Sequence, residues 1–179
     1  MSMAFFVGMK SKDGLTKVGA VIVTGEHQIV SVGYNGFPRG VNDDEPTRRE
    51  RPLKYLYSVH SERNALYNAH YVGASVKGCT LYTPWLPCTV CAQSIIQEGL
   101  SRVVHYYSRE NGMGHQPIVN TDGREDWGKM AIESDKMFYE SGVVCERYKG
   151  PLYTGSIVQV CNGVISTPVD ERSEKEKML

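Results

Sequence analysis

The stretch Val59-His60-Ser61-Glu62 and its downstream partner Pro87-Cys88-Thr89-Val90-Cys91 organise the rest of the chain. One imidazole and two thiols are ligands that zinc accepts readily, and the Glu62 carboxylate is left over for another task. Three protein ligands leave a fourth position open, whereas a structural zinc site is normally closed by four. The two stretches therefore predict a catalytic zinc site at which a water molecule is activated.

Each stretch is expected at the entrance of a helix. Residues 61–71 carry small and apolar side chains at helical spacing, and the first stretch opens that pattern. At a helix entrance the backbone of His60 can still be extended, so that His60 and Glu62 can converge although they are two residues apart. Cys88 and Cys91 are three residues apart and share a helix face, where the unpaired N–H groups of the first turn favour thiolates.

Strands and helices alternate along the chain. Strands are expected over 18–23 and 29–34, as a hairpin, and over 79–83, 103–107 and 143–145; helices are expected over 3–9, 61–71, 87–99 and 127–138. This order predicts an α/β fold with a five-stranded mixed sheet flanked by helices. Glycine and proline interrupt every pattern between residues 35 and 54, and a loop of this length directly after a strand favours a functional role.

Composition limits the classes of partner. The 179 residues are long enough for one domain, and 20 basic and 20 acidic side chains give a net charge of zero. Without a positive field, a small substrate is favoured over a nucleic acid polymer. No apolar run is long enough to span a bilayer and no signal peptide is recognisable, so we expect a cytoplasmic protein that does not bind membranes.

The five cysteines do not suggest a disulfide framework, because the number is odd and two of them form a Cys-x-x-Cys pair. Cys79 and Cys145 lie in apolar, strand-like runs, where a buried and inert thiol is expected. The cysteine pattern therefore adds only Cys88 and Cys91 to the functional residues.

The order His-x-Glu followed by Pro-Cys-x-x-Cys is the signature of the zinc deaminases, in which the glutamate is not a ligand. The chain resembles the deoxycytidylate (dCMP) deaminase family within that superfamily. The narrower resemblance rests on Ser11-Lys12-Asp13 followed by Lys17-Val18-Gly19-Ala20, on Gly33-Tyr34-Asn35-Gly36-Phe37-Pro38-Arg39-Gly40, and on Asp43-Asp44. It implies a three-layer α/β/α cytidine deaminase-like fold, with a deaminase domain over residues 1–148 and an extension over 149–179 whose last ten or so residues are frayed.

The resemblance also implies the reaction and its catalytic residues. His60, Cys88 and Cys91 would hold Zn²⁺, and Glu62 would act as general acid and base. A zinc-activated water would attack C4 of cytosine, converting dCMP to dUMP and ammonia and so supplying dUMP for thymidylate synthesis. The family has alanine where Ser61 stands, which should be tolerated because that position acts through its backbone N–H.

The implied substrate contacts are Asn35, Ser61, Trp85 and Leu86. Asn35 would contact the sugar 3′-hydroxyl and the pyrimidine, Ser61 the pyrimidine carbonyl, and Trp85 and Leu86 the base; ordinary packing is an equal alternative for Trp85. For the 5′-phosphate the candidate donors are Ser11, Lys17, Tyr107 and Arg109, each of a type that is commonly found on protein surfaces.

By resemblance the protein is a homo-hexamer that dCTP activates and dTTP inhibits, with Mg²⁺ accompanying the triphosphate. The second, allosteric nucleotide site would comprise Gly36, Phe37, Arg39, Asn42, Asp43, Asp44, Arg48 and Arg49. Aspartate carboxylates suit magnesium and arginines suit phosphates, whereas Arg48-Arg49-Glu50-Arg51 could also be a solvated charge run.

Two other functions remain open. The chain could be a zinc deaminase that acts on tRNA or on a free cytosine nucleoside, although a tRNA-binding protein should carry a basic face. It could also be a non-catalytic zinc-binding interaction domain, which would need a fourth ligand such as His70. Residues 111–127 could form a lid, an interface or a disordered loop, and residues 149–179 have no recognisable counterpart in the family.

Overall fold

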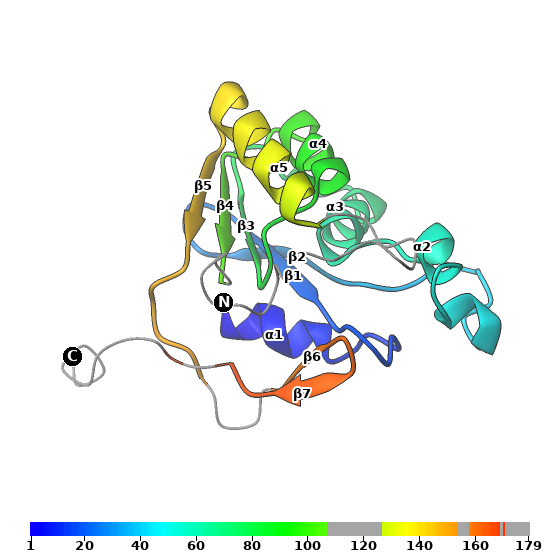
Figure 1. The fold of residues 1–179 in the computed structure, drawn as a ribbon. Helices are drawn as coiled ribbons and strands as arrows, with labels where there is room; N and C mark the ends of the chain where they lie inside the picture. Colours follow the sequence, from blue (N-terminus) through cyan, green and yellow to red (C-terminus); the bar gives the residue numbers. More distant parts are fainter. Residues whose placement is uncertain (107–126, 154–157, 169, 171–179) are drawn as a thin grey trace.

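The computed structural model describes residues 1–106, 127–153, 158–168 and 170. Five strands form one mixed sheet: β1 (Gly19–Val23), β2 (Ile29–Tyr34), β3 (Thr80–Thr83), β4 (Arg102–His105) and β5 (Val144–Arg147). The helices are α1 (Ser2–Gly8), α2 (Lys54–Tyr57), α3 (Ser61–Tyr71), α4 (Thr89–Gln97) and α5 (Trp127–Ser141). The predicted α/β class and mixed five-stranded sheet are confirmed (Figure 1).

The strand order in the sheet is β2-β1-β3-β4-β5. Strand β1 is antiparallel to both β2 and β3, while β3, β4 and β5 run parallel to one another. Helices α4 and α5 provide the crossovers between the parallel strands, as parallel pairing requires. The carboxyl ends of β3 and β4 therefore meet at one edge of the sheet, which is where ligands bind in α/β proteins.

Strand β1 lies in the middle of the protein and is buried along its whole length. Ala20 and Ile22 belong to the main core cluster with the helices α3, α4 and α5. Val21 and Val23 point to the other face and pack with Ala4 of α1. The sheet thus separates two helical layers, with α1 on one face and α3 to α5 on the other (Figure 1).

Two regions contain structure that the sequence patterns did not predict. The expected loop over residues 35–54 contains a 3₁₀ helix, η1 (Pro46–Arg49), and leads into the short helix α2. A second sheet, made of β6 (Gln159–Cys161) and β7 (Val164–Ser166), follows the main sheet in the chain.

The β6–β7 hairpin returns to the amino-terminal part of the chain, beside α1 (Figure 1). The amide of Lys17 donates to the Val160 carbonyl at 2.9 Å, and the amide of Gly163 donates to the Leu15 carbonyl at 2.8 Å. Within its described part, the extension over residues 149–179 is thus hydrogen-bonded to the segment that precedes β1. The predicted frayed end falls on residues 171–179, outside the described residues, as does most of the segment 111–127.

None of the helices in the described part of the chain combines the length and the hydropathy needed to cross a bilayer.

Candidate metal centre and catalytic site

Helix α3 brings the first stretch to the site. Its N-cap is His60, whose backbone is extended with φ −69° and ψ 156°, as the spacing of the motif requires. Glu62 lies in the first turn of the helix and is almost fully buried. The change from extended to helical backbone at residue 60 turns the His60 and Glu62 side chains toward one site.

Helix α4 brings the second stretch. Cys88 is its N-cap, again with an extended backbone (φ −69°, ψ 169°), and Cys91 lies in the first turn. Pro87 comes just before the cap and not inside the first turn, so the helix begins two residues later than the sequence suggested. Both thiols are buried, with 3% and 0% of the residue exposed.

The two helix entrances meet. The His60 Nδ1 atom lies 3.4 Å from the Cys88 Sγ atom and 3.5 Å from the Cys91 Sγ atom. All three ligand atoms lie within 4.8 Å of one another, and among the described residues no other group of three His, Cys, Asp or Glu side chains could share a metal ion. His70 Nε2 lies 2.9 Å from Glu98 Oε2, and His70 does not join the group as a fourth ligand.

The donor set fits zinc chemically. The hydrogen bond with Cys91, assisted by His60, lowers the pKa of the Cys88 thiol to about 4. Its partner Cys91 keeps the proton, and the shared hydrogen bond together with burial raises the pKa of the Cys91 thiol. One thiolate is therefore already present at neutral pH beside an imidazole nitrogen, which suits a metal that prefers sulfur and nitrogen ligands.

Glu62 lies beside this group in a dry environment. Burial is the largest influence and raises the pKa of its carboxyl, the charge on His60 opposes that shift, and the charge on Cys88 adds to it. The Ser61 hydroxyl donates a hydrogen bond of 2.9 Å to Glu62 Oε2. A carboxyl whose pKa is raised toward neutrality is suited to taking up and giving back a proton.

The predicted substrate residues lie in different surroundings. Asn35 is buried, and its side-chain amide makes two hydrogen bonds to the backbone: Oδ1 accepts from the Val18 amide and Nδ2 donates to the Thr16 carbonyl, each at 2.8 Å. Trp85 packs against the cluster of Phe5, Tyr106 and Leu152, which matches the packing alternative. Leu86 is half-buried.

Two of the four phosphate candidates are described by the structure. Ser11 is buried and its hydroxyl donates to the Asn35 carbonyl at 2.7 Å. The ammonium group of Lys17 contacts the Ser11 carbonyl. Tyr107 and Arg109 lie outside the described residues.

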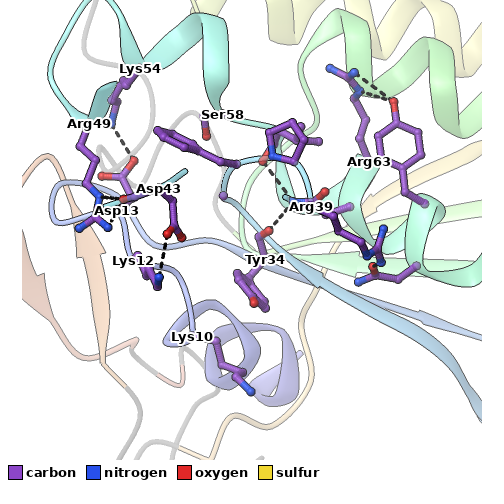
Figure 2. Close-up of a pocket in the computed structure, with 17 residues that line it drawn as sticks. Lys10, Lys12, Asp13, Tyr34, Arg39, Asp43, Arg49, Lys54, Ser58 and Arg63 are labelled. Atoms are coloured by element: carbon purple, nitrogen blue, oxygen red, sulfur yellow. Dashed lines mark hydrogen bonds and ion pairs between the residues drawn. The ribbon is translucent and has the colours of Figure 1, made fainter. Parts of the chain in front are cut away.

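A cavity of about 560 Å³ opens beside the loop that follows β2 (Figure 2). Residues that line it include five of the predicted allosteric set, namely Gly36, Phe37, Arg39, Asp43 and Arg49. The full lining carries six basic side chains and two acidic ones, although the whole chain has no net charge: Lys10, Lys12, Arg39, Arg49, Lys54 and Arg63, with Asp13 and Asp43. The cavity is thus a local cationic pocket.

The remaining three predicted allosteric residues are not among those that line this cavity. The Arg48 guanidinium donates to the Asn42 carbonyl at 3.1 Å and lies 4.9 Å from the centre of the Tyr57 ring. Asp44 lies 3.7 Å from Lys12 and 3.6 Å from Arg49, which makes it part of the ion-pair network at the cavity.

The sequence patterns missed Asp13 and Lys54 as functional candidates. Their side chains form a buried ion pair at the cationic pocket, with 2.8 Å between Lys54 Nζ and Asp13 Oδ2. The resemblance had used Asp13 only as a family marker, and Lys54 lies in a segment that was expected to be a loop. A sequence carries no sign that two residues 41 positions apart form a pair.

Comparison with known proteins agrees with this site. Residues 1–107 match a family described as the cytidine and deoxycytidylate deaminase zinc-binding region. The chain is 40% identical over 141 residues to an uncharacterized deaminase of Aliivibrio fischeri, and the match covers 79% of this chain and 85% of the relative. It is 45% identical over 132 residues to the deoxycytidylate deaminase of Homo sapiens, covering 69% of this chain and 73% of the relative.

Among solved structures, the dCMP deaminase of the cyanophage S-TIM5 in complex with dCMP and dUMP has the same fold. Its TM-score is 0.56 at 22% sequence identity, and the match covers 82% of this chain and 91% of that one.

Proposed function

Because the chain belongs to the cytidine and deoxycytidylate deaminase family of zinc enzymes, we propose that it hydrolyses dCMP to dUMP and ammonia. The observation that carries this proposal is the group of His60, Cys88 and Cys91 with a buried Glu62 beside it. Relatives that bear the name deoxycytidylate deaminase support dCMP as the substrate.

In this proposal His60 Nδ1 and the two thiolates hold one zinc ion. A bound zinc lowers the pKa of a water molecule and so supplies a nucleophile at neutral pH. The three protein ligands come from two helix entrances that are fixed by packing on the same sheet, which keeps the ligand atoms in place before the metal arrives. The two cysteine ligands are buried, whereas His60 is partly exposed.

Glu62 is the proposed general acid and base. Its carboxylate takes the first proton of the attacking water and delivers it to N3 of the cytosine ring. It then takes the proton of the hydroxyl now attached to C4 and delivers it to the departing amino group. The water oxygen remains on C4 as the uracil carbonyl, and ammonia leaves, so that atoms and protons balance. The Ser61 hydroxyl holds Oε2 of Glu62 during these transfers.

An assay of ammonia release tests this proposal. We expect dCMP to be deaminated much faster than deoxycytidine, dCTP or an RNA hairpin, and Glu62→Gln to lower the rate by at least about 100-fold while zinc stays bound. Equal rates with and without the 5′-phosphate would refute the nucleotide substrate and favour a nucleoside deaminase. Full activity of Glu62→Gln would refute the role of Glu62, and a preference for the hairpin would indicate a tRNA enzyme.

The cationic pocket is the proposed allosteric site for dCTP and dTTP. It is large enough for a nucleotide, and its excess of basic side chains suits a triphosphate. Asp43 lies 2.9 Å from Lys12, and Asp44 is paired with the same lysine and with Arg49. A triphosphate would draw these cations away, which would free the two carboxylates to bind an accompanying Mg²⁺.

Substitution of Arg39 tests the allosteric proposal. Arg39 lines the pocket, contacts Asn68 and lies 4.4 Å from the centre of the Tyr71 ring. We expect Arg39→Ala to weaken the effect of dCTP and dTTP on the dCMP saturation curve about tenfold. Arg102→Ala, which removes an arginine of β4 that is paired with Glu146 of β5, serves as the control. A dCMP curve that neither effector shifts in the wild-type protein would contradict an allosteric site, and the hexamer remains a prediction.

A further inference from the structure

The ion pair between Lys54 and Asp13 is more buried than the other ion pairs recorded in the described part of the chain. Only 8% of the Lys54 side chain and 16% of the Asp13 side chain are exposed, and 2.8 Å separates Lys54 Nζ from Asp13 Oδ2 (Figure 2). Removing one partner of such a pair leaves the other charge in a poorly solvated place. Each of the two side chains therefore depends on the other for its position.

The second oxygen of Asp13 holds the segment that follows it in the chain. Asp13 Oδ1 accepts hydrogen bonds from the amides of Leu15 at 2.8 Å and Thr16 at 3.1 Å. A carboxylate that binds an ammonium with one oxygen and two amides with the other has its orientation fixed. Lys54 thereby fixes the turn over residues 13–16 through Asp13.

The turn over residues 13–16 also holds Asn35. The Thr16 carbonyl accepts from Asn35 Nδ2 at 2.8 Å, and the Ser11 hydroxyl both donates to the Asn35 carbonyl at 2.7 Å and accepts from the Asp13 amide at 3.2 Å. Asn35 is therefore tied on two sides to the short stretch that contains Asp13. Its neighbour Gly36 lines the cationic pocket, as do Asp13 and Lys54.

The metal ligands are held by other contacts. Val59 exchanges two backbone hydrogen bonds with Gly36 at 2.8 and 3.1 Å, but His60 itself is fixed as the cap of α3, where its carbonyl accepts from the Asn64 amide at 2.9 Å. The two cysteines are carried by α4. Weakening the turn at residues 13–16 should therefore disturb Asn35 without moving the zinc ligands. Loss of the ion pair should therefore weaken substrate binding and leave the rate of the chemical step nearly unchanged.

We propose that Asp13 and Lys54 are positioning residues that fix Asn35 for nucleotide binding. The inference rests on the proposed function and on the expected contact between Asn35 and the nucleotide substrate. Loss of the ion pair raises KM for dCMP and leaves kcat nearly unchanged, because the reacting groups stay in place. A residue that acted only on folding would lower the amount of active enzyme and would leave KM unchanged.

Steady-state kinetics of the full-length, zinc-loaded protein test the proposal. We expect Lys54→Met and Asp13→Asn each to raise KM for dCMP about tenfold, with kcat within about threefold of wild type. Zinc content should be unchanged. Lys54→Arg keeps the charge and should restore KM to within about twofold, and the double variant Asp13→Asn/Lys54→Met should be no worse than either single variant.

The control is Lys136→Met, which breaks an exposed ion pair with Glu133 of similar length, 3.0 Å, on α5. It should leave KM and kcat at the wild-type values. If Lys54→Met does not fold, Asp13→Asn gives the same readout, because an asparagine oxygen can still accept the amides of Leu15 and Thr16.

Three results would overturn the proposal: a KM within twofold of wild type in both single variants, a loss confined to kcat, or failure of both single variants to fold. If the wild-type protein deaminates dCMP and the variants keep the wild-type KM and kcat, only this inference is refuted. A wild-type protein that does not deaminate dCMP removes the proposed function, and this inference with it.

Discussion

Gly33 on β2 lies directly beneath Ser61, the first residue of α3. A β-carbon on Gly33 would overlap the carbonyl oxygen of Ser61 and the amide nitrogen of Ala65, and would lie 2.8 Å from the Ala65 Cα atom. The helix therefore rests on bare backbone at this point, and this contact sets the position of its first turn, which carries Glu62.

Substitution of Gly33 should damage both stability and the metal site. Because the added methyl group would meet backbone atoms that cannot move alone, we expect Gly33→Ala to lower the free energy of unfolding by about 3 kcal/mol. Zinc should also bind more weakly, because α3 would be displaced together with His60. Urea unfolding and zinc titration measure the two effects. Gly25→Ala, where nothing lies within 4 Å of the added carbon, should change neither.

Substitution of single cysteines should show which thiols bind the metal and which do not. Cys91→Ser replaces a buried sulfur ligand by a hydroxyl, which zinc binds poorly, so the zinc content should fall from about one ion per chain toward zero. Cys145→Ser changes a half-buried thiol on β5 and should keep the metal. Metal analysis after dialysis decides between them, and equal zinc in both variants would rule out Cys91 as a ligand.

The buried carboxyl of Glu62 should make the metal-free protein sensitive to pH. Burial raises its pKa in the folded state, so its stabilising contribution is complete below the unfolded pKa, about 4.3, and is lost as the pH rises through the folded value. Glu62→Gln lacks this titration. The variant should match wild type near pH 4 and become more stable than wild type toward neutral pH in urea unfolding. A stability difference that does not change with pH would contradict this.

The Ser61 hydroxyl should matter for catalysis because it contacts the carboxyl of Glu62. Its hydrogen bond to Oε2 opposes the rise in the pKa of Glu62, so Ser61→Ala should shift the acidic limb of the kcat/KM profile to higher pH. We expect kcat/KM to fall about three- to tenfold at neutral pH.

The matched control for Ser61 is Ser94→Ala. The Ser94 hydroxyl donates to a backbone carbonyl of its own helix, α4, so the substitution should leave the pH profile unchanged. An identical profile in Ser61→Ala and wild type would show that the hydroxyl does not influence Glu62.

Local patterns in the sequence were sufficient to predict the five-stranded sheet and the group of His60, Cys88 and Cys91. Apolar periodicity located β1, β2 and α3, and the spacing of the motif required the extended backbone that His60 shows. These features depend on neighbouring residues, which a single sequence displays directly.

The features that were missed depend on contacts between distant segments. The β6–β7 hairpin had a recognisable sign, Asn162-Gly163 between two short runs of β-branched residues, and these two residues adopt φ values of 49° and 79° in the turn. The pairing of this hairpin with Lys17 had no recognisable sign in the sequence. The two hydrogen bonds from the Asn35 side chain to the backbone were likewise not predictable, because a sequence does not show which polar groups a buried side chain meets.

Strand β2 forms one outer edge of the sheet, and its carbonyl groups do not all await a partner strand. Asn64 and Asn68, one turn apart on α3, donate their side-chain amides to the carbonyls of Tyr34 at 2.8 Å and Val32 at 2.7 Å. An edge whose acceptors are already occupied is a poor template for a strand from another molecule. The β2 edge should therefore resist the addition of a strand from another molecule, which is the step that leads to fibrils.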